Sequence, residues 1–254
     1  MTDAAVSNAA GAPAATLTVV IPVYNEQNTW RQIVQRVQAV KLPCARQLVL
    51  VDDCSRDGTR QQLADHARQT AGQSTPTGLP AVKVLFHEVN QGKGAALRTG
   101  FAAADGDLVV IQDADLEYDP ADYPKLLAPL LAGQADVVYG SRFAGPASRK
   151  GAWQNYIANR FLTALSNLTT GLALTDMETC YKMFRRSIIQ SVRLEQDRFG
   201  FEPEVTAKVA RLRVKVVEVP ISYHARSRAE GKKIGWRDGL KAVWCILKYG
   251  LFRR

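Results

Sequence analysis

Carboxylates follow directly after two apolar segments of strand length. The first group is the pair Asp52-Asp53, and the second is the triplet Asp113-Ala-Asp115. In open α/β sheets, ligands bind at the carboxyl ends of the strands, where two such groups would meet. Oxygen ligands suit hard divalent cations, and an Asp-x-Asp spacing lets two carboxylates converge on one ion. We therefore expect Asp113 and Asp115 to hold Mg²⁺ or Mn²⁺.

Two common phosphate-binding motifs are absent. Lys93 lies between two glycines, but a P-loop requires the pattern G-x-x-x-x-G-K-[ST], and residue 87 is His while residue 94 is Gly. The first apolar strand leads into Pro-Val-Tyr-Asn-Glu and lacks the G-x-G-x-x-G of dinucleotide-binding folds. The sequence therefore excludes both of these nucleotide-binding classes.

Apolar strand-like segments alternate with helix-like segments through the first 140 residues. The strand-like segments are 17–24, 47–51, 82–86, 108–112 and 136–139. The helix-like segments between them are 26–40, 59–70, 94–104 and 120–131. Strands that are apolar almost throughout and alternate with helices are typical of a parallel sheet covered on both faces. We therefore predict an α/β fold.

The remaining residues have a different pattern. Long amphipathic helices are predicted at 153–172 and 236–252, with aromatic residues on the apolar stripe and Lys or Arg nearby. Strands at 180–184 and 214–223 flank a helix near 203–212. Helices of this composition lie in membrane interfaces, but an apolar stripe also suits a helix that covers a sheet. The sequence leaves both interpretations open.

The charged residues are also distributed unevenly on the two sides of residue 140. The chain of 254 residues has a net charge of +9, but residues 1–140 carry 15 acidic and 11 basic side chains, whereas residues 141–254 carry 9 and 22. A basic half is typical of proteins that bind phosphate or an anionic membrane. A nucleic acid would explain the basic charge but not the carboxylates beside it, so we expect no nucleic-acid partner. No apolar segment reaches the roughly 20 residues of a transmembrane helix.

The N-terminal segment and the cysteines indicate the cellular compartment of the protein. Residues 1–16 are rich in alanine and lack the basic start of a secretory signal, so we interpret them as a disordered tail. The four cysteines are scattered, without the spacing of a zinc site, which favours free thiols in a reducing compartment. We therefore expect a cytoplasmic location.

Five motifs occur in order along the chain. They are VIPVYNE at 20–26, VDDCSRDGT at 51–59, NQGKG at 90–94, GD at 106–107 with DAD at 113–115, and GSR at 140–142. Together they resemble the family-2 glycosyltransferases, and more narrowly the dolichyl- or polyprenyl-phosphate hexosyltransferases, mannosyl or glucosyl. The resemblance implies a GT-A fold, a Rossmann-like and mostly parallel sheet flanked by helices, here with a C-terminal amphipathic helical extension.

The same resemblance implies an activity and a division of the chain. The activity is the inverting, metal-dependent transfer of a hexose from a nucleotide sugar, UDP-glucose or GDP-mannose, to a polyprenyl or dolichyl phosphate. The enzyme would work peripherally, at the cytoplasmic face of a membrane. After the tail, residues 17–235 would form the transferase domain and residues 236–254 the amphipathic helix. Within the domain, residues 17–140 would bind the nucleotide sugar and residues 141–235 the acceptor.

Donor-binding residues follow from the resemblance. They are Pro22, Tyr24, Glu26, Asp53, Lys93, Asp113, Ala114, Asp115 and Arg226. Asp53 would contact the base or ribose, and Asp113 and Asp115 would bind the diphosphate through the metal. Glu117 stands where related enzymes often carry Gln, and it is either a third metal ligand or an exposed acid at a helix start. Lys93 either approaches the donor or is a solvated lysine.

Acceptor-binding residues are expected in the basic half. The resemblance implies that Arg142 of the GSR motif and Arg160 on the following helix hold the acceptor phosphate, and arginine forks suit phosphate oxygens. It also implies that Lys232 and Lys233 lie on an acceptor loop. Together with Asp115, we predict Arg142 and Asp176 as catalytic, Asp176 being either a general base or the cap of a turn. An ionised phosphate needs positioning more than deprotonation.

Alternative functions share part of this pattern. A family-2 transferase acting on a saccharide or another cell-envelope acceptor would keep the acidic half but would not need the arginines. A phosphatase with an aspartyl nucleophile would carry its acidic motif on the first strand, whereas residues 113–115 follow the fourth. Related enzymes often continue into transmembrane helices after the last amphipathic helix. We therefore expect peripheral membrane contact or a membrane partner subunit here.

Overall fold

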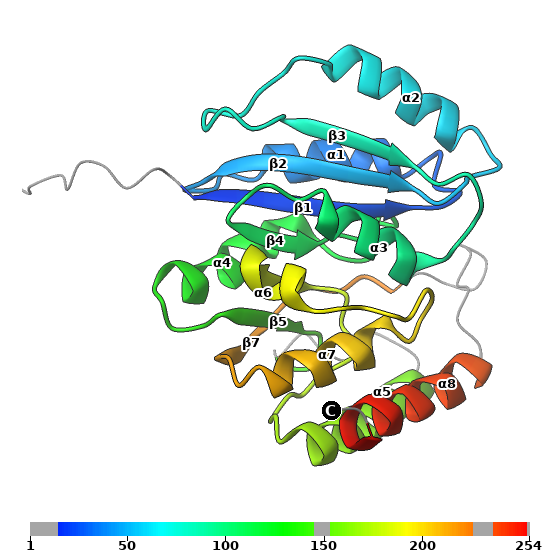
Figure 1. The fold of residues 1–254 in the computed structure, drawn as a ribbon, viewed down its shortest axis with the longest axis vertical. Helices are drawn as coiled ribbons and strands as arrows, with labels where there is room; N and C mark the ends of the chain where they lie inside the picture. The colour runs from blue at the N-terminus through cyan, green and yellow to red at the C-terminus, as the bar shows by residue number, and fades with distance from the viewer. Residues whose placement is uncertain (1–14, 145–152, 226–235, 253–254) are drawn as a thin grey trace, which may run out of the picture.

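A seven-stranded sheet organises the molecule (Figure 1). The computed structural model describes residues 15–144, 153–225 and 236–252. The strand order is β3-β2-β1-β4-β6-β5-β7. The strands are β1 (Thr16–Val23), β2 (Ala45–Asp52), β3 (Val82–Phe86), β4 (Leu108–Ile111), β5 (Val137–Ser141), β6 (Lys182–Arg185) and β7 (Val216–Pro220). β6 runs antiparallel to β4 and β5, and the other neighbouring strands are parallel, which confirms the predicted fold class.

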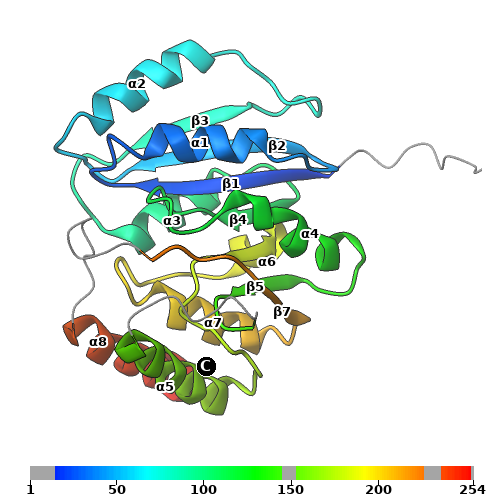
Figure 2. The ribbon, with the colours of Figure 1, turned by 180° about the vertical axis from the view of Figure 1, so that it is seen from behind.

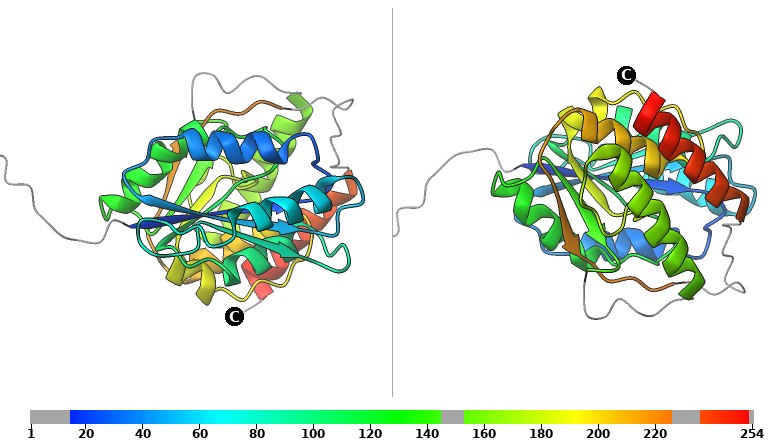
Figure 3. Two further views of the ribbon diagram at one scale, coloured as in Figure 1. Left: turned by 90° about the horizontal axis from the view of Figure 1, so that it is seen from above. Right: turned by 90° about the horizontal axis from the view of Figure 1, so that it is seen from below.

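Helices cover both faces of the sheet. They are α1 (Trp30–Ala39), α2 (Thr59–Thr70), α3 (Lys93–Ala102), α4 (Tyr123–Leu131), α5 (Trp153–Thr170), α6 (Arg186–Ser191), α7 (Phe201–Arg211) and α8 (Trp236–Leu247), with the 3-10 turn η1 (Pro120–Asp122) and the π-helical turn η3 (Lys248–Phe252). α1 and α4 lie on one face, and α3, α6 and α7 lie on the other (Figures 1 and 2). α5 and α8 lie side by side against α7 (Figure 3).

The central strands owe their position to their side chains. Leu17, Val19 and Ile21 of β1 are completely buried, as expected for a strand flanked by two parallel neighbours and covered on both faces. Gly100 lets α3 approach this strand closely, because a Cβ atom there would lie 2.3 Å from Val20 Cγ1. The sheet therefore carries the predicted strand ends on a rigid, closely packed base.

Two boundaries differ from the sequence-based expectations. β1 begins at Thr16, inside the predicted tail, because the carbonyl of Ala15 accepts a hydrogen bond from Ala45 N and extends the ladder. Residues 1–14 lie outside the described residues. α1 begins at Trp30 rather than at residue 26, because Asn25 has a left-handed backbone with φ of 55° and the chain turns before the helix.

The packing of α5 and α8 bears on the two interpretations that the sequence left open, membrane contact and coverage of the sheet. α5 and α8 pack on each other and on α7. Their buried residues Leu162, Ala242 and Ile246 belong to the main hydrophobic core, so each helix has an inward apolar side. In the described parts of the chain, no helix combines the length and the apolar character needed to cross a bilayer.

Candidate active site

Strands β1, β2 and β4 end at one edge of the sheet (Figure 1). Unusual backbone angles are concentrated at this edge. Shortly after these ends, three non-glycine residues have left-handed backbones: Asn25 with φ of 55°, Cys54 with 60° and Leu116 with 65°. Such conformations are uncommon for residues with a Cβ atom, and they cluster at functional sites. The edge that the acidic motifs predicted is therefore also the strained edge.

The carboxylate of Asp53 organises a loop at this edge. One oxygen accepts hydrogen bonds from Gln91 N (2.9 Å) and faces His87 Nδ1 (2.8 Å). The other accepts from Gly92 N (2.7 Å) and Asn90 Nδ2 (2.9 Å). The Asp53 side chain is only 4% exposed. The structure therefore places Asp53 at the predicted edge, with its carboxylate engaged by the loop that precedes α3.

Lys93 lies at the start of α3 and joins two carboxylates. Its Nζ atom is 2.9 Å from Asp113 Oδ1 and 3.5 Å from Glu202 Oε1, and its side chain is 20% exposed. Burial disfavours the charged amine, but the neighbouring carboxylates, Asp113 foremost, hold the pKa of Lys93 well above its ordinary value. The solvated-lysine interpretation is therefore wrong, because the amine is in direct contact with the Asp-Ala-Asp motif.

Asp115 and Glu117 lie on the tight turn after β4. Glu117 N donates a hydrogen bond to Asp115 Oδ1 (3.1 Å), and Tyr223 OH donates to Glu117 Oε2 (3.0 Å). The described residues contain no group of three or more His, Cys, Asp or Glu side chains already gathered as a metal site. The donor set at this turn is carboxylate oxygen, and Asp113 is 17% exposed at its edge. These residues fit Mg²⁺ or Mn²⁺, which prefer oxygen ligands.

A buried amide fixes the base of this turn. Gln112, the residue before Asp113, accepts hydrogen bonds at Oε1 from Tyr123 OH (2.6 Å) and Tyr181 OH (2.7 Å). Its Nε2 atom donates to the carbonyls of Asp113 (3.1 Å) and Tyr118 (3.4 Å). Gln112 therefore ties the acidic turn to α4 and to the residue that precedes β6. A polar amide at the end of an otherwise apolar strand was the sequence signal for this role.

Arg142 forms a bidentate ion pair with Asp176. Arg142 Nε lies 2.7 Å from Asp176 Oδ2, Nη2 lies 2.8 Å from Oδ1, and the backbone N also donates to Oδ2 (2.9 Å). Asp176 is completely buried, and the guanidinium is 12% exposed, 5.1 Å above the ring of Tyr223. Burial opposes the charge, yet nearby Tyr118 and Asp176 hold the pKa of Arg142 well above its ordinary value. Asp176 thus orients Arg142.

A second carboxylate supports this ion pair from β7. Glu218 accepts hydrogen bonds from Thr175 N (2.9 Å), Thr175 Oγ1 (2.6 Å) and Asp176 N (2.9 Å). Arg160, which is exposed on α5, donates to the carbonyl of Thr175 (3.3 Å). The structure therefore brings Arg142, Arg160 and Asp176 together and adds Glu218, which has no distinctive sequence signal.

The other predicted residues either lie at the site edge or fall outside the described residues. Pro22 lies in β1, and Tyr24 and Glu26 are half-buried just beyond it. All three are at the site edge, as is the buried Ala114. Glu26 accepts a hydrogen bond from Thr29 Oγ1 (2.6 Å). The predictions for Arg226, Lys232 and Lys233 lie outside the described residues.

The carboxyl group of Glu178, which interacts electrostatically with Arg142 and Asp176, has a strongly raised pKa. Its Oε1 atom is buried without a hydrogen-bond partner. Burial, and then the charge of Glu202, raise the pKa of Glu178 to about 8, against the opposing effect of Lys182 and Arg142. The folded protein therefore keeps this carboxyl protonated at pH values where the unfolded chain is ionised.

The raised pKa of Glu178 predicts a pH-dependent stability. Because the folded state binds the proton more tightly, this group stabilises the fold fully below about pH 4.5, its ordinary pKa, and less and less as the pH rises towards 8. Glu178→Gln should flatten the fall of Tm between pH 5 and 8 and should be the more stable protein at pH 8. Thermal unfolding followed by circular dichroism over this range tests it, and parallel curves for the two proteins would contradict it.

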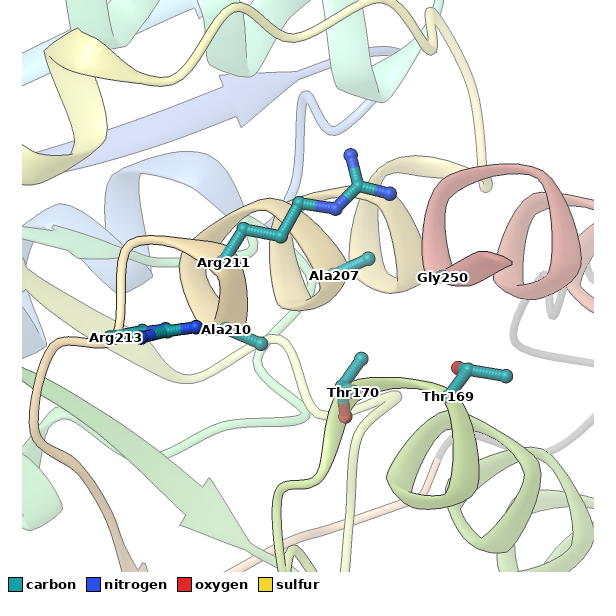
Figure 4. Close-up of a pocket in the computed structure, with 7 residues that line it drawn as sticks. All are labelled: Thr169, Thr170, Ala207, Ala210, Arg211, Arg213 and Gly250. Carbon is teal, nitrogen blue, oxygen red and sulfur yellow. The ribbon is translucent and has the colours of Figure 1, made fainter. Parts of the chain in front are cut away.

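A cavity of 240 Å³ lies between the ends of α5 and α7 and the turn η3 (Figure 4). Thr169 and Thr170 line it from the end of α5, Arg211 and Arg213 from the end of α7, and Gly250 from η3. The Arg211 guanidinium donates a hydrogen bond to the carbonyl of Tyr249. We therefore interpret Arg211 as a cap of the carbonyls of η3 and not as part of the active site.

The sequence profile of glycosyl transferase family 2 matches residues 18–193, which is more than half of the chain. The protein belongs to glycosyl transferase family 2. The matched segment contains Asp53, Lys93, both aspartates of the Asp-Ala-Asp motif and the Arg142–Asp176 ion pair. It ends before α7, so Glu202 and Glu218 lie outside it.

Similar curated proteins are lipid-phosphate sugar transferases. This transferase is 34% identical over 218 residues to the undecaprenyl-phosphate 4-deoxy-4-formamido-L-arabinose transferase of Sodalis glossinidius (strain morsitans), covering 85% of this chain and 62% of that protein. It is 30% identical over 226 residues to the enzyme of the same name from Pseudomonas fluorescens (strain Pf0-1), covering 87% and 61%. The chain thus spans about three fifths of the length of these relatives.

Solved structures share the fold of this transferase. Glucosyl-3-phosphoglycerate synthase from Mycobacterium tuberculosis, in complex with Mn²⁺, UDP and phosphoglyceric acid, has a TM-score of 0.68 at 19% identity, covering 94% of this chain and 80% of that one. The same enzyme with Mg²⁺ and UDP has a TM-score of 0.65 at 20% identity, covering 94% and 81%. The predicted GT-A fold is confirmed.

Proposed function

We propose that this enzyme transfers a hexose, with inversion, from a nucleotide sugar to a polyprenyl phosphate at the cytoplasmic face of a membrane. The observation that carries the proposal is the placement of two unlike sites on one sheet. Asp113 and Asp115 follow β4, and the guanidinium of Arg142 follows β5, two strands away. One group suits a metal-bound diphosphate and the other suits a phosphate nucleophile. The names of the curated relatives support the lipid-phosphate acceptor.

On the donor side, the residues hold a leaving diphosphate. Asp113 and Asp115 would hold the divalent metal, which supplies Lewis-acid stabilisation of the leaving nucleotide when bound. Lys93 adds a positive charge beside Asp113. Asp53 keeps the Lys93 loop in place through its bonds to Gln91 N and Gly92 N.

On the acceptor side, Arg142 orients the phosphate oxygen that attacks C1 of the sugar. Asp176 holds the guanidinium through Nε and Nη2, which leaves Nη1 to face an anion. Arg160 adds charge at the same turn. Because an acceptor phosphate is largely ionised at neutral pH, positioning replaces deprotonation, and the buried Asp176 acts by orienting Arg142.

A donor screen tests this function. The purified protein is incubated with radiolabelled UDP-glucose or GDP-mannose and polyprenyl phosphate, with and without EDTA, and the lipid is extracted and counted. We expect lipid-bound label from one donor, with UDP-glucose favoured because NQGKG resembles the glucosyl branch, and loss of label with EDTA. Label that appears only on a saccharide acceptor, or that resists EDTA, would contradict the proposal.

Exposed apolar residues on α5 and α8 support the membrane part of the proposal. Ile157, Phe161 and Leu168 on α5 are 51%, 61% and 82% exposed. On α8 and η3, residues with the same spacing, Leu240, Trp244 and Leu251, are 62%, 53% and 58% exposed. This spacing places each set along one face of its helix. The two helices lie next to each other (Figure 3).

The cysteines support the cytoplasmic part of the proposal. All four are free, which agrees with a reducing compartment.

The membrane contact predicts a loss of vesicle binding. In the double variant Leu168→Ser/Trp244→Ser, the affinity for vesicles with anionic lipid should fall by at least about tenfold, because two large apolar groups no longer enter the interface. Co-sedimentation with vesicles measures it. Leu131→Ser, which changes a residue that is 48% exposed on α4, is the matched control and should bind as the wild type does. Equal losses in both proteins would rule out a specific contact.

A further inference from the structure

Lys93 occupies both oxygens of a proposed metal ligand. Its amine lies 2.9 Å from Asp113 Oδ1 and 3.0 Å from Asp113 Oδ2. A cation placed between both oxygens of a carboxylate occupies the position that a metal bound by both oxygens would take, and its charge opposes a second cation nearby. In this state, the Lys93 amine neutralises the negative charge of Asp113.

The backbone on both sides of Lys93 is held by close contacts, which favours movement of the side chain over movement of the loop. Asp53 holds the two preceding amides, Gln91 N and Gly92 N. The flanking glycines are pressed against another loop, since a Cβ atom at Gly92 would lie 2.4 Å from Asp197 O and one at Gly94 would lie 2.1 Å from Gln196 O. We therefore expect release of Asp113 by a rotation of the lysine side chain, not by a movement of the loop.

A second carboxylate offers the amine another position. Glu202 Oε1 on α7 is 3.5 Å from Lys93 Nζ, beyond a normal hydrogen bond but within ion-pair distance. The Glu202 side chain is 8% exposed, so its charge is poorly screened by water. A small rotation towards Glu202 would keep the buried amine paired while it leaves Asp113.

We propose that Lys93 is a built-in competitor for the metal, and that metal binding at Asp113 moves the amine to Glu202. This inference rests on the metal-dependent function proposed above. It makes Glu202 a positioning residue that acts on the metal site through Lys93. It also implies that the protein alone holds its metal more weakly than the carboxylates by themselves would.

A Mn²⁺ titration without nucleotide or sugar tests the competition, with free Mn²⁺ measured by electron paramagnetic resonance. We expect Lys93→Met to raise the affinity for Mn²⁺ at least tenfold, and Lys93→Gln, which retains a hydrogen-bonding group, to do the same. Arg98→Met is the matched control, because Arg98 lies on the same helix but pairs with Asp197 (2.7 Å). It should stay within twofold of the wild type. No rise in either Lys93 variant, or an equal rise in Arg98→Met, would overturn the proposal.

A double-mutant cycle tests the role of Glu202. We expect Glu202→Gln to lower the Mn²⁺ affinity at least threefold in the wild type and to have no effect in Lys93→Met. An equal loss in both backgrounds would show that Glu202 acts by its charge alone, and would overturn its part. If the donor screen shows EDTA-sensitive transfer while Mn²⁺ binding ignores Lys93, only this inference fails. If no variant binds Mn²⁺, the metal fails in both proposals.

Discussion

Asp115→Asn is expected to lower the rate of sugar transfer by about 10²- to 10³-fold, because it removes a charge aimed at the leaving diphosphate. Asparagine has nearly the same shape, and its carbonyl can still accept the hydrogen bond from Glu117 N. The fold should therefore persist, with Tm close to that of the wild type. Transfer of label to polyprenyl phosphate at saturating donor measures the loss.

A nearby aspartate supplies the control for this substitution. Asp119 is half-buried and caps η1 by accepting a hydrogen bond from Ala121 N (3.0 Å). Asp119→Asn should keep transfer within threefold of the wild type. If Asp115→Asn also keeps full transfer, the assignment of the Asp-Ala-Asp motif to the donor diphosphate is wrong.

Arg142→Met is expected to abolish transfer and to destabilise the protein by about 3–5 kcal/mol, the usual cost of leaving one member of a buried ion pair alone. Asp176 would remain with no solvent exposure and without its cationic partner. Thermal unfolding and lipid-linked product formation are measured on the same preparation. A variant with unchanged stability would contradict the buried ion pair.

The stability and the function of this pair can be separated. In Arg142→Met/Asp176→Leu, no buried charge is left unpaired, so at least half of the lost stability should return. Transfer should not return, because the phosphate still lacks its guanidinium. Arg142→Lys should keep the charge but lose the bidentate geometry, and should raise the KM for polyprenyl phosphate more than it lowers kcat. Recovered transfer in the double variant would assign Arg142 a purely structural role.

The sequence was most informative where local chemistry sets the structure. The apolar run before Asp113 could only be a buried strand, so the motif had to appear at a strand end, where it lies. The start of α2 at Thr59 was predicted in the same way, from the Asp-Gly-Thr turn before it. The predicted strand at 180–184 corresponds to β6, at Lys182–Arg185.

The remaining features depend on partners distant in the sequence. Nothing local shows that β6 is antiparallel, since this follows only from its place between β4 and β5. Glu202 meets Lys93 across more than a hundred residues, and Glu218 supports Asp176 from a strand with no acidic motif. In the sequence, single acidic residues of this kind resemble ordinary surface residues, because only the fold places them in the interior.

The hydrogen bonds of Gln112 limit how this enzyme can be recombined with its relatives. Tyr181, in the segment proposed to bind the acceptor, donates to the same oxygen as Tyr123, while the amide nitrogen holds the carbonyl of Asp113. A chimera with its junction near residue 140 would join this Gln112 to a foreign residue at position 181. A parent that lacks a matching hydroxyl there would lose one anchor of the acidic turn. Exchange of acceptor specificity with such a parent therefore requires Tyr181 to be kept together with Gln112.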